Sequence, residues 1–199
     1  MIEDNKIWQI DSIYSIRVMP QDEFDPLFRK YTEKFFDEKS QVFRLREALS
    51  DIERSKLKKL NEATGNPLEL RLGLFKNSEF IGWNYSRQES AFNLYMQSSA
   101  VFPEFRRNGL YSELAKKVVS IGAEVGFQTI YSRHVATNND IIIAKLKLGF
   151  RITSIELSDI FGTLVHLAYY PNEVRRKMLD YRSGYIHPDE EIKKYLKLN

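Results

Sequence analysis

The sequence predicts an α/β (α+β) fold in which a central sheet of about seven strands is flanked by helices. Segments with the three-to-four-residue apolar period of helices occur between segments in which every second residue is apolar. Short turns rich in glycine, asparagine or proline separate successive strand-like segments. The chain has 199 residues, of which 43% are hydrophobic and 29% are charged, enough to enclose one core. We therefore expect a single domain over residues 1–199.

The composition argues against several classes of function. The chain has no cysteine, which excludes disulfides, thiolate metal ligands and a cysteine nucleophile. Its three histidines lack the spacing of a metal site, and a formal charge of +3 is too small to indicate nucleic-acid binding. No apolar run approaches the roughly 20 residues that span a bilayer, and the acidic N-terminus is unlike a signal peptide. We expect a cytoplasmic protein without a metal, nucleic-acid or membrane partner.

The first half of the chain predicts one strand, two helices and a three-stranded meander. Alternating apolar residues and short polar turns define the strands, which we expect at residues 10–19, 68–74, 80–85 and 91–101. An apolar stripe from Phe24 to Phe35 predicts the first helix. Ser40 is positioned to cap a second helix that continues to about Glu62.

The second half predicts a long helix, three further strands and several short helices. The long helix is expected over residues 110–125, because its leucines, isoleucine and valines recur at steps of three and four, and Gly126 should end it. The remaining strands are expected at residues 129–136, 151–157 and 163–170. The remaining helices are expected at residues 141–148, 173–182 and 188–198. Residues 172–199 would form a C-terminal helical extension.

The loop that precedes the long helix has the features of an anion-binding loop. Residues 106–112 offer consecutive backbone amides, and Gly109 lacks the Cβ atom that would keep a ligand away. The positive end of the helix faces the same loop. We therefore predict that a phosphate group binds here. The alternative is an ordinary strand-to-helix connection in which Arg106 and Arg107 are solvated.

The element order and two motifs resemble the GNAT superfamily of acyl-CoA-dependent N-acetyltransferases. The family's loop, (Gln or Arg)-x-x-Gly-x-(Gly or Ala) preceded by Val-x-Pro, is similar to Val101-Phe-Pro-Glu-Phe-Arg-Arg-Asn-Gly-Leu-Tyr111. The family's Asn-to-Gly-Phe segment matches Asn138 through Gly149-Phe150, and the resemblance covers about residues 13–170. It implies a mixed, mostly antiparallel sheet. It also implies transfer of an acetyl group from acetyl-CoA to a primary amine by direct attack in a ternary complex.

The resemblance implies a coenzyme A site along strand 91–101 and the loop after it. The backbone of residues 99–101 would pair with the pantetheine arm, and the loop amides would bind the pyrophosphate. The expected cofactor-binding residues are Ser99, Ala100, Val101, Arg106, Arg107, Asn108, Gly109, Leu110, Tyr111, Ser112, Asn138 and Lys145. Two of them depart from the family pattern. Tyr111 replaces the usual Gly or Ala, and Lys145 replaces the tyrosine with which many members protonate the leaving thiolate.

The chemistry also needs a proton acceptor, because a free alkylamine with a pKa of about 10 is mostly protonated at neutral pH. No carboxylate lies on strand 91–101, where the family often has one, so the candidates are His134 and Glu89. His134 could instead be a histidine that is hydrogen-bonded within the sheet. As proton donor, Lys145 would need a pKa lowered by burial. We expect it on an exposed helix face and dispensable, with Tyr111 and Tyr131 as alternatives.

The sequence does not identify the amine acceptor, which could be a small molecule or a peptide. Trp83, Tyr85 and Tyr169 could line its pocket, or they could pack in the core or against the sheet. A homodimer is possible. Two other functions stay open: a non-catalytic acyl-CoA-binding or regulatory module, favoured by the missing strand carboxylate and by Lys145, and transfer of a longer acyl chain.

Overall fold

The structure, a computed structural model that describes residues 3–36 and 45–197, confirms the α/β fold. Its sheet has eight strands in the order β1-β2-β3-β4-β5-β6-β8-β7. The strands are β1 (Ile7–Gln9), β2 (Tyr14–Val18), β3 (Glu69–Lys76), β4 (Glu79–Gln88), β5 (Asn93–Val101), β6 (Thr129–Val135), β7 (Arg151–Ser158) and β8 (Gly162–Tyr169). The helices are α1 (Gln21–Phe36), α2 (Leu45–Ala48), α3 (Asp51–Ala63), α4 (Leu110–Val125), α5 (Asn139–Lys147), α6 (Glu173–Arg182) and α7 (Glu190–Leu196), with a 3-10 turn η1 (Pro103–Phe105).

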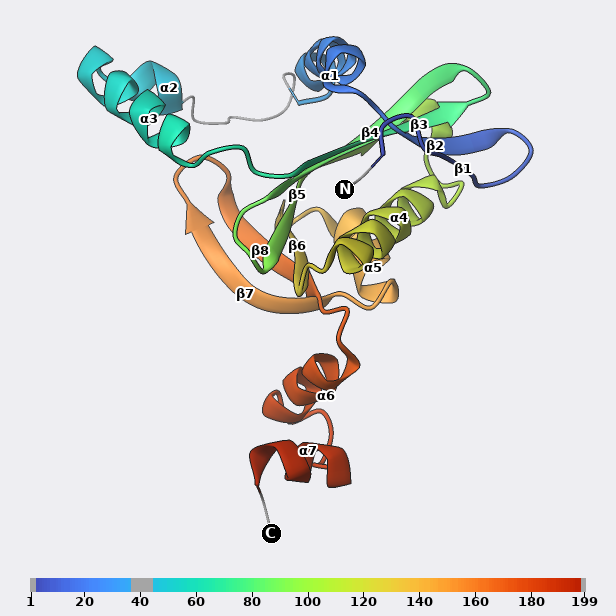
Figure 1. Cartoon of the computed structure of the whole chain (residues 1–199), viewed down its shortest axis with the longest axis vertical. Coiled ribbons are helices and arrows are strands. Elements are labelled where there is room, and N and C mark those ends of the chain that lie inside the picture. Colours follow the sequence, from blue (N-terminus) through green and yellow to red (C-terminus); the bar gives the residue numbers. More distant parts are fainter. Residues whose placement is uncertain (1–2, 37–44, 198–199) are drawn as a thin grey trace.

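The sheet separates two hydrophobic clusters. Helix α4 buries Leu114 and Val118 against alternate residues of the strands, such as Leu72 of β3. Helix α1 lies across the sheet from α4 (Figure 1) and packs Phe24 into an aromatic cluster that includes Trp83. The predicted apolar stripe of residues 110–125 is therefore the buried face of α4, although Val125 at its end is 41% exposed.

Two predictions for the N-terminal part were wrong. The first strand is a hairpin of β1 and β2, and β1 was missed because three mostly exposed residues give too short an apolar pattern. The second helix does not run unbroken to residue 62, because a new helix, α3, begins after Ser50. The Ser50 hydroxyl accepts from the Glu53 amide and the Glu53 carboxylate accepts from the Ser50 amide, which forms a capping box. Ser40 lies outside the described residues.

The sheet opens between β5 and β6. Strand β5 pairs with β4 in seven residue pairs, but with β6 only at Asn93–Tyr95, which lie beside Thr129–Tyr131 in parallel. Beyond these three pairs the two strands part. We call the region bounded by residues 96–101 of β5 and 132–135 of β6 the β5–β6 opening. A register shift at Tyr85/Ser86 bulges β5 near the start of this opening.

The C-terminal helices α6 and α7 extend beyond the end of the sheet (Figure 1). Arg151 of β7 pairs with Asp180 of α6 at 3.0 Å, and Lys177 of α6 pairs with Glu191 of α7 at 2.7 Å. Ile192 of α7 is fully buried. The two ion pairs therefore join α6 to the sheet and to α7. No helix in residues 3–36 and 45–197 is long and apolar enough to cross a membrane.

Candidate active site

The loop between β5 and α4 has the geometry that an anion site needs. Gly109 adopts a left-handed backbone with φ 74°, and it is the N-cap of α4, so no side chain caps the first amides of the helix. A Cβ atom at Gly109 would meet nothing within 4 Å, which leaves space above the loop. Arg106 folds back, and its Nε donates to the Val101 carbonyl at 2.9 Å. The Arg106 side chain thus ties the loop to the end of β5.

The β5 edge next to this loop is not covered by another strand. Past Tyr95, no described residue forms a β ladder with β5 on the side of β6. An uncovered strand edge presents amide and carbonyl groups that pair readily with an extended ligand. Residues 96–101 therefore lead from the loop to the narrow end of the β5–β6 opening, along the path that the sequence predicts for the pantetheine arm.

Lys145 closes the narrow end of the opening on the side of α5. The expectation that Lys145 lies on an exposed helix face is wrong, because only 1% of its surface is exposed to solvent. Its Nζ donates to the Ser132 hydroxyl at 2.7 Å, lies 3.1 Å from the Met96 sulfur and sits 4.4 Å from the ring centre of Phe150. No carboxylate in the described chain pairs with it. Burial without an opposite charge lowers the pKa of Lys145 to about 7.

His134, a predicted proton acceptor, shares the same buried cluster. Its Nε2 lies 2.9 Å from the Ser132 hydroxyl, so Ser132 stands between His134 and Lys145. Burial, and then the charge of Lys145, lower the pKa of His134 to about 3. At neutral pH its imidazole is therefore uncharged and is a weak proton acceptor. The alternative prediction, a strand histidine hydrogen-bonded within the sheet, describes its contact with Ser132.

Tyr111, predicted both as a cofactor-binding and as a catalytic residue, carries a buried hydroxyl without a partner among the described residues. Burial raises its pKa well above the usual tyrosine range. The group is therefore a poor proton donor, and its ring packs against the hydrophobic core. Asn138 directly precedes α5, and its side chain makes no capping hydrogen bond to that helix.

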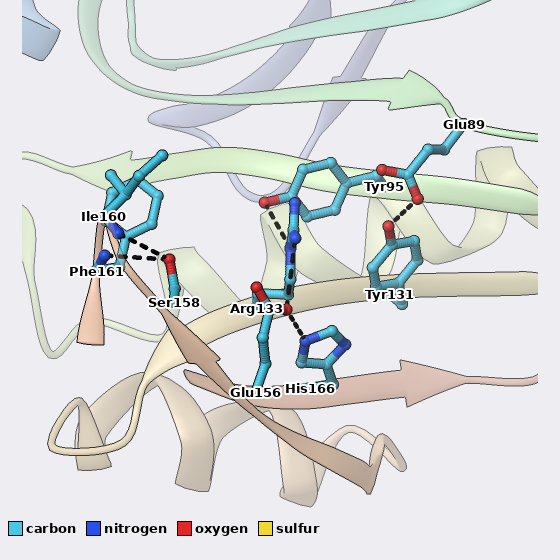
Figure 2. A network of polar contacts seen from close by, with 9 residues as sticks. All are labelled: Glu89, Tyr95, Tyr131, Arg133, Glu156, Ser158, Ile160, Phe161 and His166. Carbon is cyan, nitrogen blue, oxygen red and sulfur yellow. Dashed lines mark hydrogen bonds and ion pairs between the residues drawn. The ribbon is translucent and has the colours of Figure 1, made fainter. Parts of the chain in front are cut away.

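The opposite face of β6 carries a second polar cluster, which sequence reasoning missed. Arg133 donates from Nε to the Tyr95 hydroxyl at 3.3 Å and lies 3.5 Å from Glu156, whose carboxylate is 2.5 Å from His166 Nε2 (Figure 2). We call Tyr95, Arg133, Glu156 and His166 the Arg133 cluster. Strand period alone indicates that residue 133 faces away from residues 132 and 134. The contacts with β7 and β8, however, come from non-local pairing.

Glu89, the other predicted proton acceptor, lies near the paired end of β5 and β6. Its carboxylate accepts a hydrogen bond from the Tyr131 hydroxyl (Figure 2). Burial and this carboxylate together raise the pKa of Tyr131 far above neutral, so Tyr131 keeps its proton and is a poor acid. Tyr131 stacks on Tyr95 with ring centres 5.0 Å apart. Glu89 is therefore exposed but held in place.

Of the three aromatic residues predicted for the acceptor pocket, Tyr85 lines a cavity. This cavity, of about 250 Å³, lies between α1, β3 and β4, and the Tyr85 hydroxyl donates to Glu69 beside it at 2.8 Å. Trp83 is completely buried in the aromatic cluster beneath α1, so it packs in the core instead of lining an open pocket. Tyr169 packs against Phe150, with ring centres 5.5 Å apart.

Comparisons with known proteins relate this arrangement to acetyltransferases. The family model described as "Acetyltransferase (GNAT) family" matches residues 24–150. The solved structure of yncA, a putative acetyltransferase from Salmonella typhimurium with acetyl-CoA, has a TM-score of 0.59 and 14% identity, covering 81% of this chain and 96% of that one. A ribosomal-protein-S5-alanine acetyltransferase from Vibrio fischeri has a TM-score of 0.62 and 10% identity, covering 84% and 98%. No curated protein matches the sequence significantly.

Proposed function

Since this chain belongs to the acetyltransferase (GNAT) family and is therefore an acyl-CoA-dependent acyltransferase, we propose that it transfers an acetyl group from acetyl-CoA to a primary amine in a ternary complex. The observation that carries this proposal is the uncovered β5 edge, which ends at the loop that precedes α4. The two features together offer backbone partners for an extended arm and amides for its phosphates.

The residues present fit acetyl-CoA as the donor. The amides of residues 107–112 would hold the pyrophosphate, and the backbone of residues 99–101 would pair with the pantetheine arm. The open space above Gly109 agrees with a ligand at this place. Lys145 would lie beside the reactive end of the pantetheine arm, and Asn138 would lie on the side of the arm that faces α5. We propose that Arg106 acts mainly by fixing the loop, because it bonds to Val101.

Acetyl-CoA supplies the acetyl group as a thioester, so the protein needs mainly to position the two reactants and to handle protons. The backbone amides of β5 would orient the reacting carbonyl. The acceptor would approach from the face of the sheet that α1 covers, where Tyr85 lines the cavity. We propose a small-molecule or peptide amine as the acceptor. Two similar structures are named for acetylating alanine of ribosomal proteins, which favours including peptides with a free N-terminus in a search.

The acceptor must lose a proton before or during its attack. Of the two predicted proton acceptors, His134 has the less suitable pKa, of about 3. Glu89 stays a candidate, although Tyr131 holds its carboxylate. We add the Glu156–His166 pair, which lies on the face opposite Lys145 and has partly exposed groups. Replacing Glu89 or His166 with glutamine, and comparing the pH dependence of turnover, would separate these two.

Isothermal titration with acetyl-CoA tests the donor site. We expect saturable binding that falls at least tenfold in Gly109→Val, because a β-branched residue disfavours φ 74° and would occupy the space of the ligand. Gly184→Val is the matched control, since Gly184 has φ 77° with equally open surroundings but lies in the C-terminal extension. Arg107→Ala should weaken binding only modestly.

Equal affinities for Gly109→Val and Gly184→Val would refute the loop assignment. Preferential binding of longer acyl-CoAs would favour transfer of a longer chain, and failure of every acyl-CoA to bind would reject the donor site altogether. Once binding is established, release of free thiol with a panel of amines would identify the acceptor class. Binding without thiol release from any amine would favour the regulatory alternative. The cytoplasmic location, a possible homodimer and the lack of nucleic-acid or membrane partners stay predictions of the sequence.

A further inference from the structure

Lys145 occupies the one place where the two strands of the opening and helix α5 meet. The last parallel pair joins Tyr95 to Tyr131, and the next residues of the two strands are Met96 and Ser132. The Lys145 Nζ contacts both, at 3.1 Å from the Met96 sulfur and at 2.7 Å from the Ser132 hydroxyl. An amine that can carry a proton is therefore fixed at the narrow end of the opening.

This narrow end is where the reactive end of the donor would arrive. Residues 96–101 of β5 span roughly 16 Å at about 3.3 Å per residue. The loop that would bind the phosphates lies at one end of this edge, and Lys145 lies at the other. An extended arm that pairs with the edge would therefore point its sulfur toward Lys145. This inference rests on the donor site proposed above.

We propose that Lys145 donates the proton that converts the departing coenzyme A sulfur into a thiol, and that Ser132 and His134 return a proton to Lys145. As the nitrogen of the acceptor bonds to the acetyl carbon, the carbon–sulfur bond breaks and its electron pair leaves on sulfur. One proton of the Lys145 ammonium moves to that sulfur, which leaves a neutral amine. The Ser132 hydroxyl then gives its proton to Lys145 and takes one from His134 Nε2, while the other ring nitrogen of His134 takes one from water. The hydroxide that this leaves takes the proton that the acceptor nitrogen loses as the amide forms, so the charges balance.

The surroundings of Lys145 suit this role. Among the residues described in contact with its amine, Met96 and Phe150 are apolar, Ser132 is neutral, and His134, one step further, is the only group that titrates. A pKa of about 7 means that both protonation states occur near neutral pH. Proton transfer from such an ammonium to a thiolate with a pKa of about 8.5 is favourable. A lysine with an ordinary pKa would give up its proton less readily.

The test is the titration of the thiol of coenzyme A bound to the protein, followed by the ultraviolet absorbance of the thiolate. An adjacent ammonium stabilises a thiolate, so the unaltered protein should lower the pKa of the bound thiol. In Lys145→Met, which has a similar shape and no charge, we expect that pKa to be at least one unit higher. Lys147→Met, an exposed lysine on the same helix, is the matched control and should titrate like the unaltered protein.

Equal thiol pKa values in the unaltered protein and in Lys145→Met would overturn the proposal. So would an equal rise in Lys147→Met, because the effect would then not be specific to the buried amine. If coenzyme A binds to neither protein, the donor site itself fails, and isothermal titration identifies that outcome separately. Thus failure of Lys145 as donor and failure of the proposed function give different results.

A second variant separates charge from proton transfer. Lys145→Arg keeps a positive charge that does not leave at accessible pH. It should therefore keep the thiol pKa low while slowing thiol release from acetyl-CoA roughly ten- to hundredfold, as Lys145→Met also should. Normal thiol release in Lys145→Arg would show that only the charge matters, and it would overturn the assignment of Lys145 as proton donor.

Discussion

The two faces of β6 carry polar clusters of opposite character. On the face toward α5, Lys145 and Ser132 are buried and His134 is half-buried, and the described part of the chain provides no carboxylate to this lysine. On the other face, the Arg133 cluster is partly exposed and contains the ion pair of Arg133 with Glu156. The buried cluster has pKa values shifted toward neutral states. In the Arg133 cluster, the pKa of Glu156 is lowered, first by its hydrogen bond to His166, and that of Arg133 is raised, so both groups stay charged.

This difference arises because the two faces of strand β6 have different surroundings. Alternation along β6 sends Ser132 and His134 to one side and Arg133 to the other. A group that must change its protonation state during a reaction benefits from burial without an opposite charge. Groups that orient a ligand benefit from fixed charges. The comparison therefore predicts that the change in stability between pH 7 and pH 10.5 arises from the face that carries Lys145, and three changes test it.

The largest effect is expected from Lys145→Met, which removes the buried amine. The pKa of Lys145 in the folded protein, about 7, lies below the ordinary lysine value of 10.5. Below pH 7 the buried amine is therefore charged, and this charge destabilises the folded state. At about 1.4 kcal/mol per pKa unit, the variant should be more stable at pH 6 by on the order of 3–5 kcal/mol. Urea unfolding followed by circular dichroism measures this difference.

The pH dependence gives the sign of the same effect. Between pH 7 and 10.5 the unfolded chain holds a proton on Lys145 that the folded chain has released, so the stability of the unaltered protein rises with pH in this window. The advantage of Lys145→Met should therefore shrink by about 1.4 kcal/mol per pH unit there. A stability advantage of Lys145→Met that stays constant from pH 6 to pH 10 would mean that Lys145 does not titrate in this range.

A smaller effect is expected from Ser132→Ala, which removes the hydroxyl that accepts from Lys145. Loss of a buried partner of a charged group should destabilise the fold by about 1–3 kcal/mol at pH 6. The loss of stability should be much smaller in the Lys145→Met background, because that variant has no ammonium that needs the Ser132 hydroxyl as a hydrogen-bond acceptor. A double-mutant cycle in urea measures this coupling. Additive effects would show that the contact between Ser132 and Lys145 contributes little.

The smallest effect is expected from Glu156→Gln in the Arg133 cluster. Its carboxylate is partly exposed, and exposed ion pairs contribute little to stability. We expect an unfolding midpoint close to that of the unaltered protein, and a pH dependence between 7 and 10 that does not change. If Glu156→Gln altered that window as strongly as Lys145→Met, the contrast between the two faces would be wrong.

The sequence predicted the local parts of this site better than the non-local ones. The loop and α4 follow from neighbouring residues, because Gly109, the apolar stripe and Gly126 act within one helix. The burial of Lys145 could not be predicted in this way. It depends on where β6 diverges from β5 and on how α5 lies against both, whereas a lysine between two apolar residues of a helix is usually exposed.

The same reason explains what was missed elsewhere. The Arg133 cluster joins residues on β5, β6, β7 and β8, which pair across long stretches of sequence. Its members carry no spacing motif. The sequence left two positions open for Trp83, the core or a pocket, and packing in the aromatic cluster beneath α1 places it in the core. Periodicity indicates which face a residue occupies, but the partner on that face is set by the fold.

The three residue pairs between β5 and β6 have a consequence for local stability. They are the only ladder, within the described residues, that connects β6, β7 and β8 to the rest of the sheet, so few ladder hydrogen bonds cross this junction and core residues such as Ile130 and Leu167 supply most of the contact. A donor that pairs with the β5 edge and touches α5 would bridge this junction. Occupancy of the site would then oppose partial unfolding, so the co-substrate would serve as a structural element of the sheet as well as a reactant.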